Sequence, residues 1–296
     1  MDHLTPLIAP SFLPLHRQIV KDTFSHYWLK GGRGSTKSSF ISIEIILGIM
    51  RDPNANGAVL RKVGATIRDS VFEQLQWAIT HLGVADLWEP KVSPLSLVYL
   101  PTGQKIIFRG ADNPKKIKSA KVSQGYIRYI WYEEVDEFYG MDELRIINQS
   151  LMRGGNKFDV FYSYNPPKNA SHWINGEVAL QSIRQDTLIH HSDFRAVPST
   201  WLGEQFVAEA EHLRRVSPQL YQHEYLGEIT GTGGEVFINL SLREISDAEI
   251  VEFDRVRRGI DWGYGSDPFV YLAAQVDVSK RIILINLQCL TLNSLV

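Results

Sequence analysis

Residues 31–38 constrain what this chain can fold into more than any other stretch. They read GGRGSTKS and approach the phosphate-binding template G-x-x-x-x-G-K-[ST]. Gly31, Lys37 and Ser38 fall on the template, whereas Thr36 replaces its second glycine. The side chain of Thr36 must therefore occupy space that usually belongs to glycine. The alternative is a tight glycine-rich turn, without a ligand, in front of an amphipathic helix.

The residues on either side give this stretch the context that phosphate binding requires. The apolar residues 27–29 predict a buried strand, and the apolar run 39–50 predicts a helix. A strand, a glycine-rich turn and a helix start direct several backbone N–H groups to one point, where the helix dipole also favours an anion. In such a loop Lys37 reaches the β- and γ-phosphates, and the Ser38 hydroxyl binds Mg²⁺.

Composition limits the class of protein without identifying it. The 296 residues suffice for one large domain or two ordinary ones, and a content of 44% hydrophobic and 22% charged residues is typical of globular proteins. Because the net charge is −2, any surface for nucleic acid must be a local basic one. Cys289 is the single cysteine, which excludes a disulfide framework and a cysteine-based zinc site. The nine histidines show no convincing metal spacing.

Targeting signals are also missing from the sequence. The longest apolar run, 40–50, contains Glu44 and is too short to span a bilayer. The first fourteen residues are broken by prolines and lack the basic region of a signal peptide. We therefore expect a protein of a reducing cytosol.

Strand and helix patterns alternate along the chain and predict an α/β fold, with a mostly parallel sheet flanked by helices. The glycine-rich residues 231–234 predict a linker. Before the linker, the patterns predict strands at 58–63, 96–100, 105–108, 126–132 and 158–164 and helices at 65–82 and 207–215. After it, they predict a second set of strands at 256–260, 270–276 and 281–287.

A second phosphate-site element lies at residues 127–134, where an apolar strand ends in Glu133 and Glu134. This is the shape of a Walker B strand, whose terminal acids reach the phosphates at the carboxyl edge of a parallel sheet. Glu133 replaces the usual aspartate and would organise Mg²⁺ and its water, and Glu134 would be the catalytic base. A strand ending in two solvated acids is the alternative. Asp136 and Glu137 follow on an expected helix, and we interpret them as solvated or structural.

The strand at 158–164 leads into Asn165, Pro166 and Pro167. Two prolines stop the strand and make a rigid exit. If this strand neighbours the phosphate site, the Asn165 side chain reaches the γ-phosphate and reports its hydrolysis. Taken alone, an asparagine before proline is also a common turn former.

In combination these motifs resemble the large terminase subunit of tailed bacteriophages, the motor that packages DNA into proheads. The order and combination of the motifs are more specific than any single motif, and they extend over nearly the whole chain. The residues that carry the resemblance are GGRGS-x-KS at 31–38, RGADNP at 109–114, the tryptophan-containing strand with paired glutamates at 127–134, NPP at 165–167, SHW at 171–173, YLGE at 225–228 and GIDWG at 259–263.

The resemblance implies an ATPase of the additional-strand P-loop class, with ATP and Mg²⁺ as cofactors. Arg33 would sense or stabilise the γ-phosphate as an arginine finger does, with ordinary surface charge as the alternative. Glu134, Arg33 and Asn165 would be the catalytic and coupling residues, and Ser38 and Glu133 would hold the Mg²⁺. The nucleotide would contact Gly31, Gly32, Arg33, Gly34, Ser35, Thr36, Lys37, Ser38 and Glu133. A segment with Phe12, His16 and Gln18 would contribute to the adenine pocket.

The family also joins this motor to a nuclease with an RNase H-like fold. The resemblance implies an ATPase domain at 1–230, with a linker or lid subdomain at about 170–230, a connector at 231–254 and a nuclease fragment at 255–296. Asp261 would end the first nuclease strand and bind Mg²⁺ or Mn²⁺. A two-metal nuclease needs several carboxylates, and in this fold the others come from later strands and a later helix. We therefore expect the nuclease to be truncated and inactive in this chain.

The implied partners are double-stranded DNA, the terminase small subunit and the portal protein, with a homo-oligomeric ring during packaging. The implied location is the cytoplasm of the bacterial host, without a membrane. Four lysines between residues 115 and 121 offer contacts to DNA phosphates, with a solvated loop as the alternative. Two other functions stay open, namely a helicase-like P-loop ATPase and a non-catalytic prophage remnant.

Overall fold

The computed structural model describes residues 6–112, 117, 121–231, 245–261, 269–276 and 282–290. Contacts within the chain define two compact units, Met1–Glu235 and Val236–Val296. The division falls just after the expected linker at 231–234, of which only Gly231 lies within the described residues. Among the described helices, none has the length and apolar character needed to cross a membrane.

The first unit is built on an eight-stranded sheet with the order β3-β4-β5-β2-β6-β7-β1-β8. All neighbours from β5 to β8 in this order pair in parallel, and the antiparallel pairs are β3–β4 and β4–β5 at one end of the sheet. The predicted α/β class with a mostly parallel sheet is therefore confirmed. The strands are β1 His26–Gly31, β2 Ala55–Arg61, β3 Trp88–Val92, β4 Leu95–Tyr99, β5 Gln104–Gly110, β6 Tyr126–Glu133, β7 Asp159–Tyr164 and β8 Thr187–Ser192.

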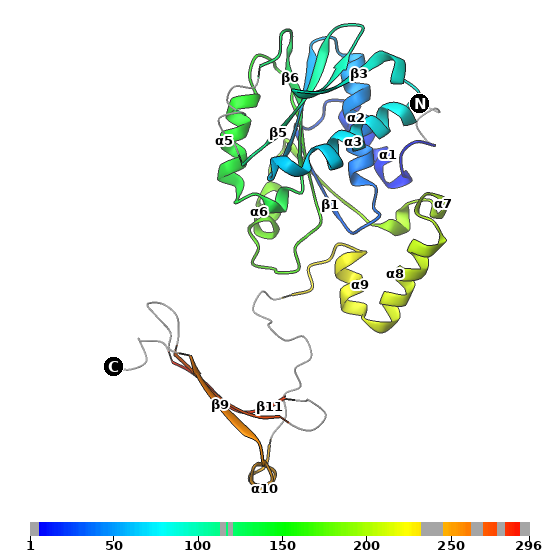
Figure 1. Ribbon diagram of the computed structural model, residues 1–296. Helices are drawn as coiled ribbons and strands as arrows, with labels where there is room; N and C mark the ends of the chain where they lie inside the picture. The colour runs from blue at the N-terminus through cyan, green and yellow to red at the C-terminus, as the bar shows by residue number, and fades with distance from the viewer. Residues whose placement is uncertain are drawn as a thin grey trace. The chain divides into compact units, whose positions relative to one another are not determined.

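Helices cover both faces of this sheet (Figure 1). On one face lie α1 (Leu13–Val20), α2 (Lys37–Arg51) and α3 (Glu73–His81), and on the other lie α5 (Met141–Leu151) and α6 (Trp173–Gln181). Each face has its own apolar core, as expected for parallel strands that are buried on both sides. The continuous helix predicted at 65–82 is interrupted, because Arg68–Phe72 forms a π-helical turn before α3 begins.

Aromatic residues of three strands form the core beneath α5. The ring of Tyr162 stacks on Trp28 at 4.2 Å and on Tyr132 at 5.2 Å between centroids. Both tyrosine hydroxyls are buried and need partners. Asn148 of α5 satisfies both: its Oδ1 accepts from Tyr132 at 2.7 Å, and its Nδ2 donates to Tyr162 at 3.0 Å. This one amide therefore fixes the position of α5 on the sheet.

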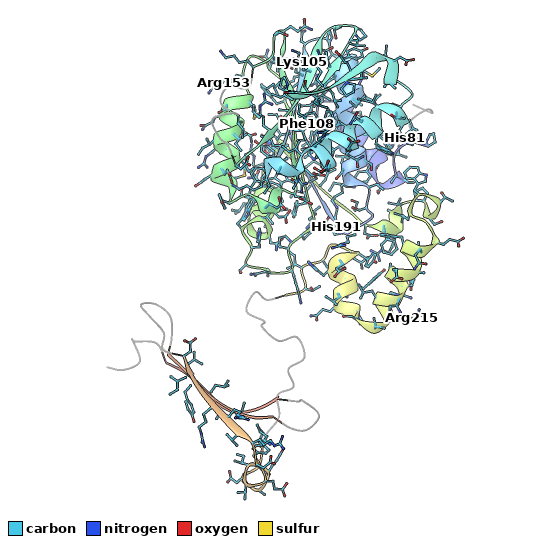
Figure 2. The ribbon with its side chains drawn as sticks, viewed as in Figure 1. His81, Lys105, Phe108, Arg153, His191 and Arg215 are labelled. Carbon is cyan, nitrogen blue, oxygen red and sulfur yellow. The ribbon has the colours of Figure 1, made fainter. Side chains whose placement is uncertain are left out.

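A small helical subdomain follows β8 and consists of α7 (Ser199–Leu202), α8 (Glu204–Val216) and α9 (Pro218–Glu224). It has a separate apolar cluster around Phe194, Tyr221 and Leu226. His191 of β8 lies where the sheet meets these helices, and its Nε2 is 2.8 Å from the carbonyl oxygen of Leu226 (Figure 2). The subdomain falls within the range expected for a linker or lid.

The second unit contains α10 (Asp247–Val251) and a three-stranded antiparallel sheet in the order β11-β10-β9. The strands are β9 Val256–Asp261, β10 Phe269–Val276 and β11 Ile282–Leu290. The three strands predicted in this region are present, and Asp261 ends the first of them.

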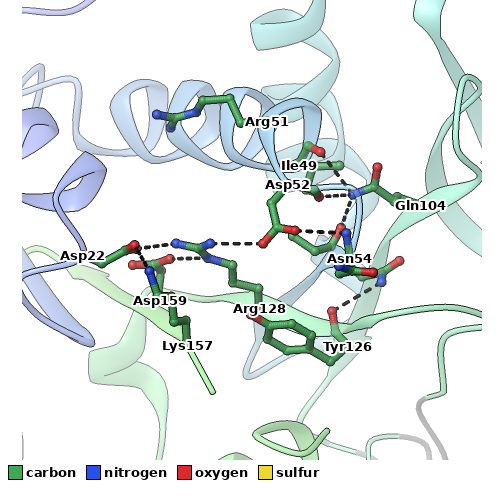
Figure 3. Close-up of polar contacts among 12 residues, drawn as sticks. Asp22, Ile49, Arg51, Asp52, Asn54, Gln104, Tyr126, Arg128, Lys157 and Asp159 are labelled. Atoms are coloured by element: carbon green, nitrogen blue, oxygen red, sulfur yellow. Dashed lines mark hydrogen bonds and ion pairs between the residues drawn. The ribbon is translucent and has the colours of Figure 1, made fainter. Parts of the chain in front are cut away.

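A charged cluster ties the sheet to the helices at the edge opposite residues 31–38 (Figure 3). Arg128 of β6 contacts three carboxylates: Asp22 at 2.5 Å, Asp52 at 3.1 Å and Asp159 at 3.0 Å. Asp22 follows α1, Asp52 follows α2 and Asp159 begins β7. Burial raises the pKa of Asp159 to about 6, and the guanidinium of Arg128 opposes that rise. One nearly buried cation therefore joins four segments of the chain.

We expect Arg128→Met to lower the free energy of unfolding by about 3–5 kcal/mol, because it leaves the buried carboxyl group of Asp159 without its cation. Chemical denaturation with urea would measure the loss. Arg145→Met is the matched control, since its guanidinium and its partner Asp142 are both mostly exposed, and it should cost at most about 1 kcal/mol. Equal losses in the two variants would contradict a special role for Arg128.

Candidate functional site

The carboxyl ends of β1, β7 and β6 meet at a cavity of about 370 Å³. β7 lies between the strand before the glycine-rich loop and the strand that ends in the paired glutamates. This inserted strand is the arrangement expected for the additional-strand P-loop class. The cavity is lined by residues 32–39, Glu133, Glu134, Asp136, Glu137, Ser163, Tyr164 and Asn165. Except for Gly31, every residue of the glycine-rich loop and of the paired glutamates therefore lines one cavity.

The glycine-rich loop has the strained backbone that its sequence implies. Thr36 takes the left-handed conformation, with φ 60° and ψ 21°, directly before α2. For a residue with a side chain, this conformation costs about 1–2 kcal/mol. The strain indicates that the loop is held in one shape by its surroundings rather than by its own preference.

The helical subdomain packs against the outside of this loop and explains two of its glycines. A Cβ on Gly32 would lie 1.9 Å from the carbonyl oxygen of Tyr225, and a Cβ on Gly34 would lie 2.5 Å from the ring of Phe206. The backbone N–H of Arg33 donates to the carbonyl of Glu224 at 2.8 Å. The side chain of Arg33 is exposed and lines the cavity.

Lys37 is buried at the centre of the loop. Its Nζ lies within hydrogen-bond distance of the carbonyls of Gly31 (3.0 Å) and Gly32 (3.3 Å). It also donates to the hydroxyl of Ser35 and to Oδ1 of Asn165, both at 2.9 Å. Asn165 is therefore brought to the loop, as predicted, and its contact there is the lysine. Burial lowers the pKa of Lys37 to about 7.

The position of Ser38 and Glu133 fits a divalent cation that also binds phosphate. The Ser38 hydroxyl donates to Oε1 of Glu133 at 3.4 Å, and Oε2 of Glu133 is buried without a hydrogen-bond partner. Burial raises the pKa of the Glu133 carboxyl. No group of three or more His, Cys, Asp or Glu side chains in the described part of the chain could hold a metal alone. A Mg²⁺ bound here would take its remaining oxygen ligands from phosphate and water.

Glu134 stands at the mouth of the cavity in a left-handed backbone conformation, with φ 50° and ψ 52°. Its carboxylate forms an ion pair with Arg61, whose Nε also lies 3.4 Å from Oε2 of Glu133. Arg61 belongs to no recognised sequence motif. The only indication of its importance is its position at the end of β2, a strand that pairs with β6.

Asp136 is a further cavity residue whose importance the sequence did not indicate. It was interpreted as solvated or structural on a helix, whereas it lies in the short 3₁₀ turn Val135–Glu137 and is half-buried. Burial is the main cause that raises the pKa of Asp136 to about 6, and the Glu137 carboxylate adds to it. The side chain therefore adds a third carboxyl group close to Lys37 and Arg61.

A second cavity, of about 420 Å³, adjoins the first, because Thr36 and Ser39 line both. Its walls are mainly apolar and aromatic: Leu7, Ile8, Ala9, Phe40, Gln74, Trp77, His81 and Trp201. Phe12, His16 and Gln18, which were expected near the adenine, do not line it. Phe12 is buried and stacks on Phe40 at 4.5 Å, and His16 pairs with buried Glu44 at 2.5 Å. Both side chains therefore pack against α2 instead of lining the cavity.

Two other sets of expected residues belong to other segments of the chain. Of the four lysines between 115 and 121, only Lys121 is within the described residues, and it is exposed. Asp261 is exposed at the end of β9 in the second unit.

Comparison with known proteins supports the same interpretation. The family model described as phage terminase large subunit matches residues 25–228. The chain belongs to this family. It is 41% identical over 284 residues to the terminase large subunit of Bacillus phage SPP1, covering 94% of this chain and 67% of that protein. It is 26% identical to the PBSX phage terminase large subunit of Bacillus subtilis (strain 168), covering 88% of this chain and 63% of that protein. The chain thus spans about two thirds of the length of these relatives.

Solved terminases share the fold. The large terminase of a thermophilic bacteriophage superposes with a TM-score of 0.61 over 97% of this chain and 69% of that one, at 12% identity. The same protein in complex with ADP gives a TM-score of 0.58 at 13% identity, over 97% of this chain and 69% of that one. At this identity the likeness concerns the fold alone.

The lowered pKa of Lys37 predicts that phosphate binding at the loop takes up a proton. The empty-site lysine is mostly neutral above pH 7, and a bound phosphate favours its charged form. Between pH 7.5 and 9 the affinity for ADP without metal should therefore fall, approaching about tenfold per pH unit. Calorimetry in buffers of different ionisation enthalpy would measure the uptake.

Lys37→Arg is the control for this measurement, because a guanidinium stays charged over the whole range. The variant should bind ADP without proton uptake. Binding by the unaltered chain with no proton exchange at pH 8 would show that the lysine is already charged in the empty site.

Proposed function

We propose that this chain hydrolyses ATP at the cavity between β1, β7 and β6 and uses the energy to translocate double-stranded DNA into proheads. One observation carries the proposal: the fold brings Lys37, Ser38, Glu133, Glu134 and Asn165, from three separate motifs, to one cavity. Membership of the phage terminase large subunit family supports it. So does the fold shared with the terminase of the thermophilic bacteriophage, which binds ADP. The helicase-like alternative lacks such support.

The residues divide the work of hydrolysis between them. The loop N–H groups and Lys37 bind the β- and γ-phosphates, and Arg33 lies free to contact the γ-phosphate as charge develops on it. Glu134 orients the attacking water and accepts its proton while the bond from the γ-phosphorus to the bridging oxygen breaks. Ser38 and Glu133 would hold a Mg²⁺, which would supply positive charge to the phosphate oxygens.

Asn165 connects this chemistry to the rest of the chain. It shares Lys37 with the nucleotide, so loss of the γ-phosphate changes the hydrogen bonds available to both side chains. Asn165 is followed by Pro166 and Pro167, which transmit a shift at this point to the segment beyond rather than absorbing it. This is the proposed start of the coupling between hydrolysis and movement.

The partners of such a motor are double-stranded DNA, the terminase small subunit and the portal protein, in a homo-oligomeric ring in the host cytoplasm. The lysines between 115 and 121 are the proposed DNA contacts. Asp261 is the proposed first metal ligand of a nuclease, which needs further carboxylates and Mg²⁺ or Mn²⁺ to cleave DNA.

Two substitutions test the ATPase. We expect Glu134→Gln to bind ATP but to lower kcat by about 10²-fold or more, since a positioned general base contributes that much. Lys37→Ala should lose both nucleotide binding and hydrolysis. Glu89→Gln, an exposed acid of β3 that lines neither cavity, is the matched control. Equal rates in the unaltered chain and both site variants would favour the non-catalytic remnant.

We further propose that the second cavity takes the purine base. It continues directly from the phosphate loop and exposes two tryptophans, Trp77 at 41% and Trp201 at 43%. Base stacking on an aromatic side chain contributes about 1–3 kcal/mol. Because Trp201 belongs to α7 and Trp77 to α3, a base in this cavity would draw the helical subdomain towards the sheet domain.

Tryptophan fluorescence tests this placement. ADP should quench the emission of the unaltered chain, and Trp77→Phe with Trp201→Phe should remove most of the quenching. Trp88→Phe is the control, since Trp88 is buried on β3 outside this cavity. Quenching that survives in the double variant would place the base elsewhere.

A further inference from the structure

A third cavity, of about 580 Å³, takes no part in the functions described so far. Its walls are α6, the ends of β1, β7 and β8, and residues 227–229, which follow α9. We propose that this cavity is a binding site for inorganic phosphate, through which this product of ATP hydrolysis leaves the chain. The inference rests on the proposed function, because the phosphate comes from the nucleotide cavity.

Three consecutive residues form the wall between the third cavity and the nucleotide cavity. Asn165 lines the nucleotide cavity, Pro166 lines the third cavity, and Tyr164 lines both. Only 3% of Tyr164 is exposed, so this wall is closed when the site is empty. A phosphate released beside Asn165 is therefore one residue away from the third cavity.

The register of the sheet places three polar side chains next to one another in the third cavity. Lys30 of β1 lies opposite Tyr164 of β7 on one side and opposite His191 of β8 on the other (Figure 2). Residues that are in register on parallel strands share one face of the sheet, and all three line the cavity. Among the described residues that line it, Lys30 is the one lysine or arginine.

Two of these groups are free to bind a ligand. Neither Nζ of Lys30 nor the hydroxyl of Tyr164 makes a hydrogen bond or an ion pair with another residue in the described part of the chain. Other polar side chains of the cavity are already engaged, since Asn175 donates to two backbone carbonyls and Ser182 donates to one. An ammonium group beside a phenolic O–H supplies the donors that a phosphate oxygen accepts.

The carboxylate of Glu228 also lines the cavity and keeps the binding of an anion weak. Glu228 is exposed, and its charge acts on Arg195 instead of forming an ion pair with Lys30. A phosphate at Lys30 is therefore attracted by one cation and repelled by one carboxylate. Weak binding suits a site that a product passes through, because a tightly held product would block the next turnover.

Hydrolysis itself acts on the wall between the two cavities. In the proposed mechanism Asn165 shares Lys37 with the γ-phosphate, so cleavage changes the contacts of a wall residue. Pro166 restricts the backbone directly after Asn165, so a shift of Asn165 also moves the lining of the third cavity. ADP still occupies the glycine-rich loop at this stage. The third cavity therefore gives phosphate a route that does not require ADP to leave first.

The experiment separates cleavage from phosphate release. In a single turnover, rapid quenching measures the cleavage of ATP, and a fluorescent phosphate-binding protein measures free phosphate. We expect Lys30→Met to slow phosphate release by about tenfold, because the anion loses the charged donor that attracts it past Tyr164. Cleavage and ADP affinity should stay unchanged, since Lys30 does not line the nucleotide cavity. Lys30→Arg keeps the charge and should release phosphate as the unaltered chain does.

Filling the third cavity tests the route without changing a charge. Ala179→Trp places an indole in the cavity and should slow phosphate release while cleavage continues at its usual rate. Leu180→Trp is the matched control, because Leu180 is the next residue of α6, is exposed and does not line the cavity. The two approaches use different residues, so a folding defect in one variant, as thermal unfolding would show, leaves the other as the test.

Three outcomes would overturn the exit route. They are phosphate release at the unaltered rate in Lys30→Met and Ala179→Trp, equal slowing by Leu180→Trp, and an equal slowing of cleavage and release. A failure of the proposed function gives a different result. In that case the unaltered chain itself forms no phosphate in the rapid-quench measurement, and the exit route is rejected together with the ATPase.

Discussion

The parallel pairing of β1, β7 and β6 is the constraint on which the site depends. Parallel strands with matched register end at the same edge, and here Lys30 lies opposite Tyr164 while Glu133 lies opposite Ser163. The residues that follow each strand therefore meet, although more than a hundred positions separate the loop lysine from Asn165. Without β7 between the other two strands, Asn165 would not reach Lys37. The cluster around Arg128 stabilises the same strands at the opposite edge.

The sequence predicted the fold class and most strands, and it singled out residues that line one cavity, because these features depend on local patterns. Apolar runs mark the buried strands, and the glycine-rich loop and paired glutamates occur at fixed positions relative to them. The edge strand β8 was not predicted, since its histidines and half-buried positions hide the alternation of a strand. The break in the helix before α3 was missed because a π-helical turn has no local signature.

The positions of Arg61, Asp136, Trp77 and Trp201 could not be predicted from the sequence for a different reason. They depend on how the fold brings segments together. Arg61 ends its strand beside the paired glutamates because β2 pairs with β6, and Asp136 lines the first cavity because it lies in a short turn after β6. The role of the adenine segment stays a prediction. Phe12 and His16 lie near the site, but their side chains are committed to the core by Phe40 and Glu44.

The hydrogen bonds of Lys37 have a consequence for the end of the catalytic cycle. In the empty loop, Nζ of Lys37 already has four oxygen atoms within reach, from Gly31, Gly32, Ser35 and Asn165. The buried amino group therefore has partners within the protein whether or not a phosphate is bound. In the proposed cycle, these oxygen atoms would compete with the product phosphate for Lys37. The loop that is proposed to bind the nucleotide therefore also contains groups that favour its release.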